Sequence, residues 1–182
     1  MPFRFNIRLC GASGQGLLQA ARILAEAAAI YNDKNAAESC AYGPDARGNA
    51  AKVDIIISDS DIDYPKIDKV DCLISLTQES YDRYENDLRP EGIVIAEASI
   101  ETGGKKDNRT LHAVPFGEIA EKACGRTDMV HLVALGFFAA VNDIIGEQSL
   151  RQAVLARAPK SCENLCIKAY EAGLGAARES AS

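Results

Sequence analysis

Three glycines within six residues stand between a strand-like and a helix-like segment near the start of the chain. The segment reads Cys10-Gly11-Ala12-Ser13-Gly14-Gln15-Gly16-Leu17. Glycine lets a backbone turn sharply and brings its N–H groups close to a ligand. A helix that begins at this turn adds the positive end of its dipole, which favours an anion. The segment therefore predicts a turn that binds a phosphate or a carboxylate.

The residues on either side of this turn show two different periodicities. Before it, Phe5, Ile7 and Leu9 alternate with polar residues, which is typical of a strand. After it, residues 15–31 are predicted to form a helix, because small and apolar side chains recur on one face. That face comprises Leu17, Ala20, Ala21, Leu24, Ala27 and Ala28.

Strand and helix patterns alternate along the rest of the chain. Strands are predicted at 36–40, 50–57, 70–76, 93–96 and 111–114, and helices at 78–88, 116–123, 129–144, 147–157 and 161–177. Residues 89–92 are expected to form a turn, and Asp128 to cap the helix that follows it.

This alternation predicts an α/β three-layer sandwich with a mainly parallel sheet and C-terminal helices. The loop 42–49 lies between two short strands, which predicts an antiparallel, hairpin-like insertion. We expect a single α/β domain over residues 1–178 and a frayed tail at 179–182.

Composition excludes several classes of partner. The 182 residues carry a net charge of −6 and no Trp, which argues against nucleic acid and anionic membranes as partners. No apolar run is long enough for a membrane span, and the first residues lack the apolar core of a signal peptide. The six cysteines include no C-x-x-C pair, so we expect reduced thiols, a cytoplasmic protein and no iron–sulfur cluster held by this chain.

The glycine turn also has to be weighed against other glycine motifs. A P-loop needs Lys and Ser or Thr after its last glycine, and Leu17 and Leu18 stand there instead. A dinucleotide-binding turn has the opposite glycine spacing, although Glu38 lies where an acid could meet a ribose. A nucleophile elbow would use Ser13, with His112 or His131 as its base. A tight turn without a ligand stays open as well, and His131 is expected to be a core residue.

Two further clusters carry weaker signals. The acids at Asp59, Asp61 and Asp63 resemble the start of a calcium loop, but Tyr64 and Val70 occupy the positions that need Gly and Glu. These acids are interpreted as a solvated turn. Cys162 and Cys166 are one helical turn apart and would need a third ligand to hold a metal, so they are interpreted as buried thiols.

A second loop reads Tyr42-Gly43-Pro44-Asp45-Ala46-Arg47-Gly48. The planar guanidinium of Arg47 suits a phosphate or a carboxylate, and Tyr42 offers a flat face and a hydroxyl. A surface arginine paired with a neighbouring acid explains the same residues equally well.

Taken in order, the two loops resemble those of the gamma subunit of the 2-oxoacid:ferredoxin oxidoreductases. That family has Gly-x-Gly-Gly-Gln-Gly in the first turn, where this chain has Ser13 in place of a glycine. Its second loop reads Tyr-Gly-Pro-Glu-x-Arg-Gly-Gly, where this chain ends in Asn49. Further matches lie near Asp128 and in the closing helix, at Pro159-Lys160, Asn164 and Ala169-Tyr170-Glu171-Ala172-Gly173.

The resemblance implies a subunit of a cytoplasmic hetero-oligomer. Such a complex oxidatively decarboxylates a 2-oxoacid to an acyl-coenzyme A, using thiamine diphosphate, Mg²⁺, iron–sulfur clusters and ferredoxin. The partners implied are the alpha and beta subunits, with a ferredoxin-like delta subunit as a third. The gamma chain is then an accessory subunit near the approach of coenzyme A, with no catalytic residue, metal or cofactor of its own.

The form of the second loop resembles the 2-oxoglutarate enzymes more than the pyruvate enzymes. The resemblance implies that Gly11, Ser13, Gly14, Gln15, Gly16, Tyr42 and Arg47 contact coenzyme A or a partner subunit. The alternative is a free-standing nucleotide- or dinucleotide-binding module.

Overall fold

The computed structural model describes residues 3–41, 50–103 and 108–180. Its strands are β1 (Arg4–Gly11), β2 (Asn35–Ala41), β3 (Ala51–Ser58), β4 (Val70–Ser75), β5 (Leu88–Glu97) and β6 (Thr110–Val114). Its helices are α1 (Leu17–Tyr31), α2 (Gln78–Tyr84), α3 (Phe116–Cys124), α4 (Val130–Val141), α5 (Glu147–Arg157) and α6 (Glu163–Ser180). Short 3-10 turns follow α2 and precede α4 (Glu85–Asp87 and Thr127–Met129).

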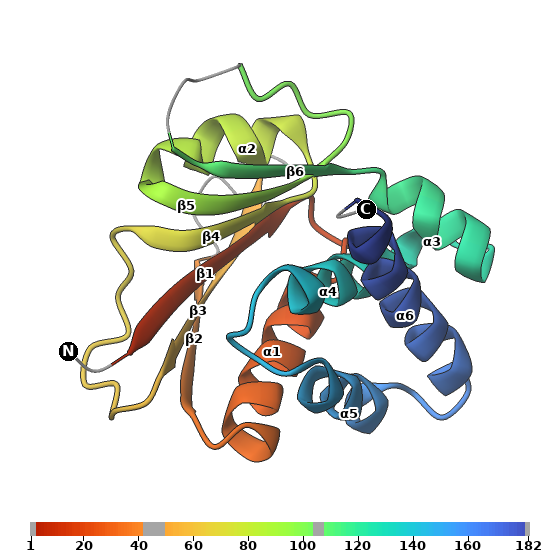
Figure 1. Cartoon of the computed structure of the whole chain (residues 1–182), viewed down its shortest axis with the longest axis horizontal. Helices are drawn as coiled ribbons and strands as arrows, with labels where there is room; N and C mark the ends of the chain where they lie inside the picture. Colours follow the sequence, from red (N-terminus) through yellow and green to blue (C-terminus); the bar gives the residue numbers. More distant parts are fainter. Residues whose placement is uncertain (1–2, 42–49, 104–107, 181–182) are drawn as a thin grey trace.

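The described strands form one sheet in the order β2-β3-β1-β4-β5-β6 (Figure 1). β3 runs antiparallel to both of its neighbours, whereas β1, β4, β5 and β6 pair in parallel. The mainly parallel sheet with an antiparallel insertion is therefore confirmed, and β3 is the strand that runs against the rest. The hairpin of β2 and β3 brings the start of β3 next to the end of β1, where Ala51 pairs with Gly11.

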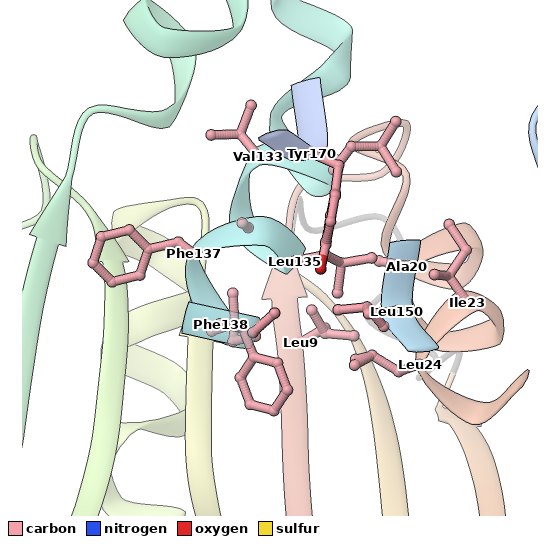
Figure 2. Packing of buried hydrophobic residues seen from close by; sticks show 14 of the residues in the cluster. Leu9, Ala20, Ile23, Leu24, Val133, Leu135, Phe137, Phe138, Leu150 and Tyr170 are labelled. Carbon is pink, nitrogen blue, oxygen red and sulfur yellow. The ribbon is translucent and has the colours of Figure 1, made fainter. Parts of the chain in front are cut away.

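Apolar side chains from alternate strand positions fill a core on each face of the sheet. On one face, Ile7 and Leu9 belong to a core shared with α1, α3, α4, α5 and α6, which lie on that side of the sheet in Figure 1. Figure 2 shows Leu9, Leu24, Leu135 and other members of this cluster pointing toward one another from strand and helices. On the other face, Cys10 packs in a smaller cluster with residues of β4, β5 and α2. The three-layer arrangement follows from this division.

The predicted apolar face of the first helix is confirmed. Its buried residues are the six that the periodicity selects, with Ile23 in addition. Small side chains on this face let α1 lie close to the sheet, because alanine adds little bulk between helix and strand.

Three local predictions are wrong. Residues 89–92 extend the start of β5 instead of forming a turn. Asp128 does not cap α4, since it lies in the preceding 3-10 turn and binds the guanidinium of Arg126. The last helix reaches Ser180, beyond the expected range of 161–177 and into the stretch expected to fray.

Candidate functional site

The glycine turn connects the C-terminal end of β1 directly to the N-terminus of α1. Gly16 is the N-cap of α1 and has a φ of 76°, and Gly14 has a φ of 89°. A side chain would be strained at both positions, since L-residues seldom adopt a positive φ. No side chain caps α1, so the free N–H groups of its first turn remain available to a ligand.

Gln15 braces the turn from within. Its side-chain Oε1 accepts a hydrogen bond from the N–H of Ala12 at 2.7 Å. A Cβ at Gly11 would lie 2.5 Å from the same oxygen, so only glycine leaves room for this contact. Gln15 therefore holds the shape of the turn, and its carbonyl oxygen is engaged by the protein itself.

Ser13 lies exposed at the tip of the turn. Among the described non-glycine residues, only Asp33 has a positive φ, so Ser13 replaces the family's glycine without that strain. Its hydroxyl and the neighbouring backbone of Gly14 face solvent. The tip thus presents polar groups to a molecule outside the chain.

One side of the turn opens into a cavity of about 320 Å³. Its walls include Ser13, Gly14 and Gly16 from the turn and Lys52 from β3. The Lys52 ammonium lies 3.5 Å from Asp54 Oδ2 and 5.3 Å from the centre of the Tyr84 ring. Both partners belong to the α2 face of the sheet, opposite α1, so Lys52 lines the cavity while its ammonium is held away from the helix N-terminus.

The sequence analysis missed Lys52, although it stands near the start of a predicted strand. The hairpin register explains its place, since Lys52 pairs with Cys10 at the entrance to the turn. The other expected site residues, Tyr42 and Arg47, lie outside the described residues. The strand that follows their loop begins beside Gly11, at the same end of the sheet as the turn.

The other side of the turn borders a second cavity, of about 220 Å³, lined by Gly14, Gly16, His131, Cys162 and Cys166 among others. A Cβ at Gly16 would lie 2.4 Å from Nδ1 of His131, so the imidazole packs directly on the glycine backbone. His131 is 6% exposed, and within the described chain neither ring nitrogen has a hydrogen-bond partner. Burial lowers the pKa of His131 to about 4, which keeps the ring neutral near pH 7. His131 is a core residue, as the sequence predicts.

The geometry does not favour the dinucleotide or hydrolase hypotheses. In a dinucleotide fold the second strand lies next to the first, but here β3 separates β2, with Glu38, from β1. Glu38 lies 3.8 Å from the Nε of Arg22 instead. His112 stands on β6, three strands and roughly 14 Å from β1 at ordinary strand spacing, too far to serve Ser13. His131 is buried against Gly16 and makes no hydrogen bond to Ser13.

The described residues contain neither a metal-binding cluster nor a membrane-spanning helix. No group of three or more His, Cys, Asp or Glu side chains is placed to hold a metal ion in the part of the chain that the structure describes. None of the described helices combines the length and the apolar character needed to cross a membrane.

Residues 6–179 match the family described as pyruvate ferredoxin/flavodoxin oxidoreductase. The chain belongs to this family. It is 35% identical to the 2-oxoglutarate synthase subunit KorC of Methanocaldococcus jannaschii, over 98% of this chain and 97% of that subunit. The resemblance predicted from the two loops is thereby confirmed.

Solved structures agree with this assignment. The gamma subunit of a keto/oxoacid ferredoxin oxidoreductase from Geobacter sulfurreducens superposes with a TM-score of 0.86. It is 36% identical to this chain, and the match covers 96% of this chain and 99% of that subunit. The 2-oxoglutarate:ferredoxin oxidoreductase of Magnetococcus marinus shares the fold at 16% identity and a TM-score of 0.84, over 97% of this chain and 31% of that longer chain.

Proposed function

We propose that this chain is the gamma subunit of a 2-oxoglutarate:ferredoxin oxidoreductase. The observation that carries the proposal is the match to the KorC subunit of Methanocaldococcus jannaschii over nearly the full length of both chains. A match of that extent indicates that this chain corresponds to a separate subunit of a 2-oxoglutarate enzyme. The Tyr-Gly-Pro form of the second loop supports the same choice of substrate.

In this proposal the subunit is accessory and the reaction takes place on other chains. Oxidative decarboxylation of a 2-oxoacid needs thiamine diphosphate, Mg²⁺ and iron–sulfur clusters, which we assign to the alpha, beta and ferredoxin-like delta subunits. We also propose a cytoplasmic complex, in keeping with six cysteines that are all free in this chain.

The glycine turn and the second loop together would form an anion site. Gly11, Ser13, Gly14, Gln15 and Gly16 shape the backbone, and Tyr42 and Arg47 would approach from the loop. We take the anion to be a phosphate of coenzyme A or a carboxylate on a partner subunit, since both suit the N–H groups at a helix N-terminus and the guanidinium of Arg47.

Coenzyme A is a reasonable occupant on chemical grounds. The Magnetococcus marinus enzyme has been solved with 2-oxoglutarate, coenzyme A and succinyl-CoA bound. A phosphate at the turn would accept hydrogen bonds from the free N–H groups of α1 and gain from the positive end of its dipole. A partner carboxylate would use the same groups, so the two occupants have to be separated by experiment.

Kinetics of the assembled complex separate the two occupants. Arg47→Ala would raise the KM for coenzyme A about tenfold, with kcat and subunit composition unchanged, if the anion is a coenzyme A phosphate. It would instead weaken assembly on size-exclusion chromatography if the anion is a partner carboxylate. Lys66→Ala is the matched control, because Lys66 lies between β3 and β4 with its side chain 66% exposed. No change in either measurement would contradict the anion site.

A further inference from the structure

Cys162 and Cys166 form a pair of thiols in direct contact at the start of α6. Their Sγ atoms are 3.8 Å apart, close to van der Waals contact. The N–H of Cys166 donates to the carbonyl of Cys162 at 2.9 Å, so the two residues span the first helical turn. Both are free cysteines. The pair is not used by the proposed anion site.

A disulfide between them needs a local change of the backbone at the start of α6. Residues four apart in an α-helix have Cα atoms about 6.2 Å apart, from the rise and radius of the helix. Disulfides span Cα separations of roughly 4.4–6.8 Å. The Cβ atoms of such residues lie about 5–6 Å apart, whereas a disulfide holds them about 3.5–4.5 Å apart. The bond therefore forms when the first turn of α6 opens, which involves only the end of the helix because Cys162 precedes its first residue, Glu163.

The two thiols differ in accessibility. Cys162 is partly exposed, whereas Cys166 is buried, at 3% exposure. Burial, followed by the hydrogen bond and charge of Cys162, raises the pKa of Cys166 to about 11, and Arg126 opposes this only in part. Cys166 therefore stays a protonated thiol near neutral pH, and an external reagent meets Cys162 first.

We propose that Cys162 and Cys166 are a thiol-modification site that closes reversibly to a disulfide by exchange with a low-molecular-weight disulfide. The Cys162 thiolate attacks one sulfur of that disulfide, forms a mixed disulfide and releases one small thiolate. The Cys166 thiol then loses its proton as its sulfur attacks Cys162, forms the intrachain bond and expels the second small thiolate, which takes up a proton. The protein loses two electrons and two protons, and the small disulfide gains both to become two thiols.

The position of the pair gives its oxidation a structural consequence. Both cysteines line the 220 Å³ cavity that Gly14 and Gly16 also line. Closing the disulfide removes two thiol groups from that lining and opens the first turn of α6. The inference rests on the pair alone and does not depend on the proposed function.

Mass spectrometry of the full-length chain tests the proposal. The reduced protein is treated with oxidised glutathione, alkylated and cleaved with trypsin, which releases residues 161–168 as one peptide containing both cysteines. We expect this peptide to lose both alkylation sites together with two hydrogens, and to recover them after reduction. A synthetic peptide of residues 161–168 confirms that the conditions oxidise this dithiol.

Two variants test the order of the steps. Cys166→Ser should accumulate a stable glutathione adduct on Cys162, and Cys162→Ser should leave Cys166 unmodified. The proposal is overturned if peptide 161–168 in the folded protein keeps both alkylation sites when the synthetic peptide has oxidised. It is equally overturned if the adduct forms on Cys166 alone, or if either cysteine links to Cys124.

Discussion

Gly136 of α4 and Gly173 of α6 each press against the backbone of the other helix. A Cβ at Gly136 would lie 2.0 Å from the carbonyl oxygen of Tyr170, and a Cβ at Gly173 would lie 2.0 Å from that of Val133. Two helices can approach this closely only where neither carries a side chain at the crossing. This crossing fixes the position of α4, which carries His131 onto the glycine turn.

The first prediction concerns this crossing. Gly173→Ala should lower the free energy of unfolding by about 1–3 kcal/mol, because the methyl group has to displace backbone that cannot move aside. Gly175→Ala is the matched control in the same helix, with no atom within 4 Å of the added carbon. It should be neutral or stabilising by up to about 1 kcal/mol, as alanine is the better helix former. Urea denaturation measures the free energy of unfolding of both variants. Equal values would contradict the account of the crossing.

A second prediction concerns the two positive-φ glycines of the turn. Gly14→Ala should cost about 1–2 kcal/mol from backbone strain alone, since its added carbon meets nothing within 4 Å. Gly16→Ala should cost more, because its added carbon also overlaps the imidazole of His131. Adding His131→Ala should remove the steric part of the destabilisation caused by Gly16→Ala. It should leave the destabilisation caused by Gly14→Ala unchanged. Double-mutant cycles by thermal and chemical denaturation measure this coupling, and additive effects at both glycines would contradict it.

The third prediction is a pH dependence due to His131. Its folded-state pKa of about 4 lies below the usual 6.5, so the unfolded chain binds a proton more readily. Stability is therefore complete above pH 6.5 and is lost as the pH falls toward 4, by at most about 3 kcal/mol. His131→Leu should lack this part of the pH dependence. The measurement is the difference in free energy of unfolding between wild type and variant from pH 7 to pH 5, and parallel pH profiles would refute the assignment.

A fourth prediction concerns the buried ion pair on the other face of the sheet. Arg8, 1% exposed, donates from Nε and Nη2 to the two carboxylate oxygens of Asp54 at 2.6 and 2.8 Å. Asp54→Ala should destabilise by about 3 kcal/mol, the lower end of the range for a broken buried pair, because Arg8 loses two hydrogen bonds but keeps Asp87 as a partner. Asp128→Ala removes the half-exposed partner of Arg126 and should cost less than about 1 kcal/mol. Chemical denaturation measures the loss of unfolding free energy in both variants. Similar losses would contradict the claim that burial makes the Arg8–Asp54 pair the more costly one to break.

Much of this fold follows from local sequence patterns. The small-residue face of α1 predicts which residues are buried, because a 3.6-residue period with alanine on one side is typical of a helix that buries that side. The turn chemistry of the loop 42–49 likewise predicts an antiparallel insertion. Residues 89–92 mislead because Pro and Gly signal a turn. In the structure they are an unpaired irregularity within β5, between the pairs Leu88–Val70 and Ile93–Cys72.

The site is harder to derive from sequence because its members meet only through the register of the sheet. Lys52 reaches the glycine turn since β3 runs antiparallel to β1 and starts beside Gly11. No periodicity of the chain encodes that pairing. His131 is predictable as a core residue from its apolar helix, but its contact with Gly16 depends on how α4 packs across the fold.

Activity of the native complex tests the central claim most directly. The chain carries an affinity tag in its source organism, and the purified complex is assayed for 2-oxoglutarate-dependent reduction of a ferredoxin substitute with and without coenzyme A. We predict coenzyme A-dependent turnover in the complex, with a thiamine-binding subunit present, and none by this chain alone. Turnover of 2-oxoglutarate by the isolated chain, or a purified complex that reduces no acceptor with 2-oxoglutarate, would contradict the account.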